Sequence, residues 1–108
     1  RQQSGDIEGA LADFSAAAAA EPSSPAARFN RARVLFDLGR HDEARADLDE
    51  LLRLSPRDVE AHMLRGRARL ASGDLPGALE DHEAAVALAP DNLRAANNLA
   101  WLLATVPD

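Results

Sequence analysis

The chain contains no cysteine and no lysine, and aromatic residues make up only 4% of its 108 residues. The absence of cysteine excludes disulfides and thiol chemistry. Scarce aromatic residues, abundant alanine and a hydrophobic content of 46% favour closely packed helices over a β-sheet, which is enriched in β-branched and aromatic residues. We therefore expect one all-α domain.

Sequence motifs that mark enzymes are also missing. The chain has no HExxH stretch, no glycine-rich phosphate loop and no strand–turn–helix element around a candidate nucleophile. His41, His62 and His82 have no cysteine or histidine at the close spacing of a zinc site, so we interpret them as packing or turn residues. We expect no catalytic activity, no cofactor and no bound metal.

The charge is unbalanced towards acid. Eighteen acidic residues stand against 12 arginines, which gives a formal net charge of −6. This balance argues against nucleic-acid binding, which depends on neutralising phosphates. No signal peptide and no apolar run long enough to cross a membrane is evident, so a cytoplasmic location is favoured. The use of arginine without lysine is typical of a GC-rich genome.

A period of 34 residues runs through the chain. Four series keep it: Pro22, Pro56 and Pro90; Gly5, Gly39 and Gly73; Asp13, Asp47 and Asp81; Ala10, Ala44 and Ala78. Repetition at this period predicts a solenoid, in which each unit stacks on copies of itself and offers an extended binding surface.

The apolar spacing within each period is helical. Ala44, Leu48, Leu51 and Leu52 follow one another at i, i+4, i+7 and i+8, which predicts one buried face. We expect six helices: the tail of a first helix at residues 1–5 followed by a lone second helix at 6–21, two complete helical pairs, and a lone first helix at 93–105. Asp42 and Asp74 are the expected N-caps of the second helices, and Pro76 is tolerated because it falls in a first turn.

The segment at residues 61–90 reads AHMLRGRARLASGDLPGALEDHEAAVALAP and resembles the tetratricopeptide repeat, a pair of antiparallel helices per 34 residues. The resemblance covers nearly the whole chain. We interpret the chain as a bacterial-type member of this family. The resemblance implies a right-handed superhelix divided into a partial repeat (1–24), two repeats (25–58 and 59–92) and a partial repeat or terminal helix (93–108). The chain is interpreted as a piece of a longer array.

In this family the first helices line a concave face, so the resemblance implies a basic groove and an acidic back. Such a groove would hold a protein or peptide partner, and an acidic one fits the charge. The residues expected to face the groove are Phe29, Asn30, Arg33, Met63, Arg67, Arg94, Asn97, Asn98 and Trp101. Arginine suits carboxylates, asparagine suits a peptide backbone, and the apolar residues would serve as anchors.

Other interpretations of these residues stay open. Phe29 and Met63 could pack between repeats, and Arg33 and Arg67 could simply be solvated. Arg31 and Arg65 are expected to pair with Asp47 and Asp81 in the same unit, although Asp13 is an alternative partner for Arg31.

Some family members grip a C-terminal carboxylate with a Lys and Asn clamp. Here Arg94 and Asn98 keep matching places, whereas Phe29, Arg33 and Leu64 depart from the pattern, so we do not expect a faithful clamp.

A second functional class is self-assembly through the two terminal helices. Ile7, Leu11 and Phe14 on the first helix, and Leu99, Leu102 and Leu103 on the last, are expected to be uncovered. Large exposed apolar patches usually mark interfaces, so a homo-oligomer is the alternative to a peptide-binding module.

Overall fold

The protein is described by a computed structural model, which gives the backbone of residues 2–21 and 23–105 and the side chains of residues 8–21 and 23–104. This part of the chain forms six α-helices and no strand. They are α1 (Gln2–Ala20), α2 (Pro25–Asp37), α3 (His41–Leu54), α4 (Val59–Ala71), α5 (Leu75–Leu88) and α6 (Leu93–Thr105). The all-α solenoid expected from the sequence is confirmed.

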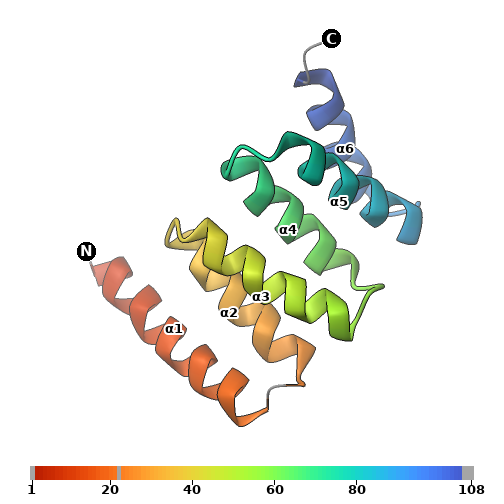
Figure 1. The fold of residues 1–108 in the computed structure, drawn as a ribbon. Coiled ribbons are helices and arrows are strands. Elements are labelled where there is room, and N and C mark those ends of the chain that lie inside the picture. The colour runs from red at the N-terminus through yellow and green to blue at the C-terminus, as the bar shows by residue number, and fades with distance from the viewer. Residues whose placement is uncertain (1, 22, 106–108) are drawn as a thin grey trace.

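The helices stack in chain order, so that each packs on the one before and the one after it. Figure 1 shows the row running from α1 to α6, with these two helices at opposite ends of the molecule. The α2 helix also contacts α4, two positions along the row. Alternate helices therefore share a face, which is where a groove can form.

Polar side chains begin the first helix of each hairpin at the same place in the period. Ser24, Asp58 and Asn92 accept hydrogen bonds from the backbone amides of residues 27, 61 and 95 at 3.3, 3.1 and 3.1 Å. Each bond satisfies one amide that the first turn of a helix leaves without a partner. These caps explain why α2, α4 and α6 begin 34 residues apart, at Pro25, Val59 and Leu93.

The second helices begin after glycine turns. Gly39 and Gly73 have φ angles of 81° and 87°, a left-handed conformation that residues with a Cβ adopt at a cost. Asp74 caps α5 as expected, with the amide of Gly77 donating to its carboxylate at 3.0 Å, and Pro76 lies in the first turn.

The expected cap at Asp42 is wrong. The position that corresponds to Asp74 is Arg40, whose side chain has no acceptor, so α3 has no side-chain cap. Asp42 instead lies inside the first turn and accepts a hydrogen bond from the Ser72 hydroxyl at 3.2 Å.

The break expected near residue 5 is also absent, because α1 runs without interruption from Gln2. The Ile7 side chain lies outside the described residues.

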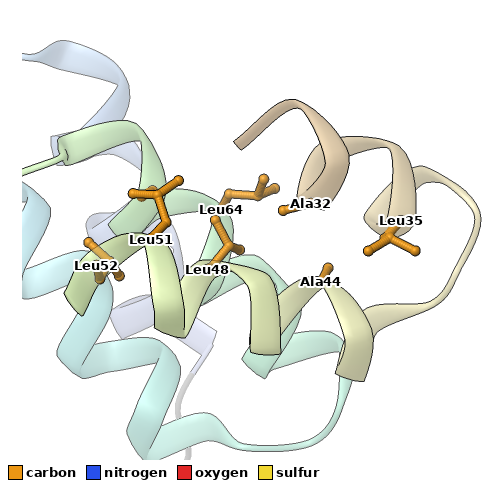
Figure 2. Packing of buried hydrophobic residues seen from close by; sticks show 8 residues of the cluster. Ala32, Leu35, Ala44, Leu48, Leu51, Leu52 and Leu64 are labelled. Carbon is orange, nitrogen blue, oxygen red and sulfur yellow. The ribbon is translucent and has the colours of Figure 1, made fainter. Parts of the chain in front are cut away.

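The core lies inside the α2–α3 hairpin and continues onto α4. Leu48 and Leu51 are fully buried, and Leu35, Leu52 and Leu64 are nearly so. Figure 2 shows these side chains gathered between the three helices. Burying one such leucine contributes about 1.5–3 kcal/mol, so this cluster fixes the relative positions of α2, α3 and α4.

Candidate functional site

Two arginine–aspartate pairs close the two complete hairpins. The Arg31 Nε donates to Oδ2 of Asp47 at 2.6 Å, and the Arg65 Nε donates to Oδ2 of Asp81 at 2.9 Å. The pairing expected from the sequence is confirmed, within one hairpin in both cases. Only 6% of Asp47 and 1% of Asp81 is exposed. The hydrogen bond to Asp47 raises the pKa of Arg31 above its usual range, which keeps the guanidinium charged.

The same two carboxylates bind further cations from the first helices. Arg28 Nη1 lies 3.3 Å from Asp47, and Arg69 Nη1 lies 3.0 Å from Asp81. The His62 ring contacts Asp81 at 3.3 Å as well. Much of the positive charge of α2 and α4 is therefore directed into the hairpins, towards α3 and α5, and is not available in a groove.

A groove of about 510 Å³ runs across the first helices of the hairpins. We call it the arginine groove. Its lining comes from three helices: Phe29 and Arg33 on α2; Glu60, Met63, Leu64 and Arg67 on α4; Arg94 and Asn98 on α6. Three arginines and one glutamate leave it with two positive charges on a chain whose net charge is −6. A charge of opposite sign to the rest of the surface concentrates anionic ligands locally.

The three arginines of the groove are not equivalent. Arg94 is paired with Glu60, and both side chains are exposed. Arg67 lies over Phe36, with its Cζ 4.7 Å from the ring centroid, so its guanidinium edge remains open. Arg33 is exposed and, among the described residues, neither it nor Arg67 forms an ion pair. These two are the groove arginines whose guanidinium groups have no carboxylate partner among the described residues.

Six of the nine residues expected to face a groove line this one: Phe29, Arg33, Met63, Arg67, Arg94 and Asn98. Met63 is only 3% exposed and packs against Ala85 and Ala95, so it forms part of the floor between repeats. Phe29 likewise packs against the core and is half-buried. The packing interpretation thus accounts for most of the surface of both apolar residues.

The other three residues lie elsewhere. Asn97 is exposed and Asn30 is half-buried, and neither lines the arginine groove. Trp101 is 60% exposed and lines a neighbouring cavity of about 340 Å³, which we call the Trp101 cavity.

The Trp101 cavity was not anticipated from the sequence. Its remaining lining comes from Phe36, Arg67, Leu70, Ala71, His82, Asn98 and Leu102. Arg67 and Asn98 belong to both cavities, which makes the two hollows neighbours along one surface. The lining includes two pairs of equivalent positions 34 residues apart, Phe36 with Leu70 and Arg67 with Trp101. The other four residues, Ala71, His82, Asn98 and Leu102, occupy unlike positions in the period. Among its residues, Arg67, Asn98 and Trp101 were expected from the sequence to face a groove.

The histidines lie in packing positions, as interpreted from the sequence. His82 is 3% exposed, and its Nδ1 is enclosed without a hydrogen-bond partner. Burial lowers the pKa of His82 below its ordinary value of 6.5; Asp81 opposes this effect and Arg67 adds to it. The imidazole is therefore neutral at pH 7. The His41 ring packs at 4.9 Å from Phe36.

The structure offers no metal-binding cluster in its described part, where no three His, Asp or Glu side chains converge. Among the helices of that part, none has the length and apolar character needed to cross a membrane.

A carboxylate clamp of the kind found in some tetratricopeptide proteins is not assembled here. Leu64 is buried, with 4% exposed, and fills the groove floor where a second asparagine would lie. Asn98 donates weakly to the Met63 sulfur at 3.8 Å. Arg94 already has Glu60 as its partner.

Comparison with known proteins identifies the same repeat family that the sequence resembles. A model of the tetratricopeptide repeat matches residues 1–59, 35–92 and 63–106. RNA polymerase II-associated protein 3 of Xenopus tropicalis is 33% identical over 97 residues, which is 90% of this chain and 15% of that protein. The chain therefore spans less than a fifth of the length of this curated relative.

Solved structures share the fold. The first tetratricopeptide domain of Spaghetti (RPAP3) bound to HSP90 peptide SRMEEVD has a TM-score of 0.87 and 28% identity, covering 94% of this chain and 81% of that one. A thermophilic tetratricopeptide protein of Thermus thermophilus has a TM-score of 0.86 and 28% identity, covering 96% of this chain and 54% of that one.

Proposed function

Because the chain belongs to the tetratricopeptide repeat family, we propose that it is a protein-interaction module that holds an acidic peptide segment in the arginine groove. The observation that carries the proposal is that Arg33 and Arg67 have exposed guanidinium groups that are not engaged in ion pairs within the described part of the chain. Both are exposed in the groove, and neither has a carboxylate partner among the described residues. An arginine fork binds a carboxylate through two parallel hydrogen bonds, which gives geometric specificity as well as charge.

The similar domain of Spaghetti binds the peptide SRMEEVD, which is acidic. This supports an acidic ligand, but the groove differs from a terminal-carboxylate clamp. With Leu64 in the floor and Arg94 paired to Glu60, binding relies on Arg33 and Arg67. We therefore propose that acidic side chains within the peptide, instead of its C-terminus, are the groups that are bound.

The test is calorimetric titration with SRMEEVD and with its neutral counterpart SRMQQVN, at low and high salt. We expect the acidic peptide to bind more tightly, by a margin that shrinks with salt because exposed charges are screened. Replacing Arg33 and Arg67 together by Gln removes two charge-assisted contacts and should weaken binding by at least about tenfold.

The matched control is the double substitution Arg53→Gln with Arg57→Gln. Both arginines are exposed outside the arginine groove, and the change in net charge is the same. We expect affinity within about twofold of the parent, since distant surface charges are largely screened. Equal affinity for the acidic and neutral peptides, or equal losses in the two double variants, would contradict the proposal.

A second candidate function is self-assembly through α6. Leu93, Trp101 and Leu103 are 77%, 60% and 54% exposed, which is unusual for large apolar side chains. The expected patch is smaller than the sequence indicated. Leu102 is only 1% exposed, so its inclusion was wrong: it packs towards the repeat stack. Leu99 is half-buried.

The α1 end is also partly covered, because Leu11 packs against the core and Phe14 is half-buried. Sedimentation equilibrium over a wide concentration range, at low and high salt, tests assembly. Association that persists in high salt and disappears in Leu93→Gln with Leu103→Gln would support it, and a monomer throughout would contradict it.

We further propose the division into two complete repeats at 25–58 and 59–92, with partial repeats at 1–24 and 93–108. The bacterial type and the cytoplasmic location stay predictions that rest on the sequence alone.

A further inference from the structure

The Trp101 cavity has the chemistry of a site for an apolar side chain. Phe36, Leu70, Ala71 and Leu102 contribute carbon surface, and Trp101 leaves 60% of its surface exposed beside them. Partly exposed aromatic side chains at the rim of an apolar hollow are typical anchors of protein-binding sites.

The floor of the cavity carries no full charge at neutral pH. His82 is buried and neutral, because burial lowers the pKa of its ring; the charged groups near it are Asp81 on its own helix and Arg67 on α4. Its Nδ1 has no hydrogen-bond partner in the described structure. The positive charge of the cavity comes from Arg67, which lies against Phe36 at the side shared with the arginine groove.

The position of Arg67 links the two cavities. A carboxylate bound to Arg67 from the arginine groove stands at the edge of the Trp101 cavity, since Arg67 and Asn98 line both. Consecutive residues of an extended peptide lie about 3.3–3.6 Å apart along the chain, so the residues next to that acid reach the cavity without a turn. A ligand that fits both hollows therefore has an acidic residue and a large apolar residue close together.

We propose that the Trp101 cavity binds a large apolar side chain of the partner peptide, adjacent to the acidic residues held by Arg33 and Arg67. The proposal deepens the function proposed above and rests on it. The complementary charge of Arg67 selects the acidic neighbour, and the apolar walls select the side chain that follows or precedes it. Selectivity for the pair gives the groove a sequence preference that net charge alone does not supply.

The test uses three short peptides with acetylated N-termini and amidated C-termini: FEEEF, SEEES and SQQQS. Phenylalanine on both sides of the glutamates makes the result independent of the direction in which the peptide lies. We expect FEEEF to bind about tenfold more tightly than SEEES, because a desolvated aromatic anchor contributes strongly to binding. SEEES should in turn bind more tightly than SQQQS.

Two variants locate the preference. Trp101→Ala removes a wall of the cavity, and because the side chain is largely exposed the fold should survive. Ala71→Leu fills the cavity from an exposed position at the end of α4 and removes no side chain. Each should reduce the affinity for FEEEF to that for SEEES. Ala100→Leu, an exposed residue that lines neither cavity, is the matched control and should keep the preference.

The outcomes separate the two proposals. Equal binding of FEEEF and SEEES, both tighter than SQQQS, overturns the apolar site and leaves the arginine groove standing. A preference for FEEEF that persists in both cavity variants also overturns it. If SEEES binds no better than SQQQS, the function proposed for the groove fails, and this inference fails with it.

Discussion

Arg65 joins a buried and an exposed aspartate at once. Its Nη2 lies 2.8 Å from Asp81 inside its own hairpin, and its Nη1 lies 2.8 Å from Asp49 on the preceding hairpin. Asp81 has 2% of its side chain exposed and Asp49 has 44%. One guanidinium thus makes two ion pairs of equal length in very different surroundings, and the free energies of the two pairs should differ accordingly.

Asp81→Asn should lower the free energy of unfolding by about 2–4 kcal/mol, because Arg65 and Arg69 lose a buried counter-ion. The matched substitution Asp49→Asn acts on the same arginine at the surface and should cost less than about 1 kcal/mol. Urea denaturation followed by circular dichroism measures both. Similar losses would show that burial does not distinguish the two pairs.

Gly66→Ala should destabilise the protein by about 1–3 kcal/mol, the usual cost of inserting a methyl group into a packed core. A Cβ at this position would lie 2.8 Å from Nε2 of His82, a confined ring, and 3.2 Å from Cβ of Asp81. Gly9→Ala is the control, because a Cβ there meets nothing within 4 Å and α1 gains a better helix former. Thermal melting should shift down for the first variant and up, or not at all, for the second.

Glu60→Gln should strengthen the binding of SRMEEVD by about two- to fivefold, the amount expected from an exposed charge pair. In the parent protein Glu60 forms an ion pair with Arg94, and its negative charge repels an acidic ligand from the edge of the groove. Glu50→Gln is the control, since Glu50 also pairs with an arginine, Arg53, but lies on α3 outside the groove. Calorimetry at low salt gives both affinities. A loss of affinity in Glu60→Gln would mean that Arg94 must be paired to bind.

Stability should decrease in acid as His82 is forced to take a proton. Its pKa in the folded protein lies below the ordinary value of 6.5, so the unfolded chain binds the proton first. The stability that depends on the neutral His82 ring is fully present above about pH 6.5. It is lost as the pH falls towards and through the lower pKa that the ring has in the folded protein. Denaturant midpoints measured on either side of the ordinary value of 6.5, at about pH 7.5 and about pH 5.5, should differ less in His82→Gln than in the parent.

The imidazole protons of His82 followed by NMR give the titration directly. A midpoint at or above the ordinary value of 6.5 would contradict the burial argument.

The fold was predictable because the same residue types recur at the same positions in successive 34-residue repeats. Proline, glycine and small residues at fixed intervals set the helix boundaries. The one misplaced cap is Asp42, because the capping position is Arg40, which has no side-chain acceptor. The Arg31–Asp47 pair was predictable for the same reason, since Arg65 and Asp81 repeat it in register.

The site was predictable only in part. Six of the nine expected groove residues line the arginine groove, because equivalent positions tend to face the same side. The exceptions are Asn30, Asn97 and Trp101. Glu60 and Arg94 are equivalent positions 34 residues apart, but their pairing depends on rotamers, as do the stacking of Arg67 on Phe36 and the burial of Leu102. The period predicts which positions are equivalent, but it gives neither side-chain rotamers nor depth of burial. The shape of the Trp101 cavity therefore became visible only with the structure.

The buried ion pairs also have a mechanical consequence. Arg31–Asp47 and Arg65–Asp81 lock helices within a hairpin, whereas successive hairpins meet mainly through apolar packing and exposed contacts such as Ser72 with Asp42. A chain pulled from its two ends should therefore part between hairpins before the hairpins themselves open. Each 34-residue unit then releases about 110–120 Å of contour when it unravels. The molecule would yield under tension in discrete, evenly sized steps.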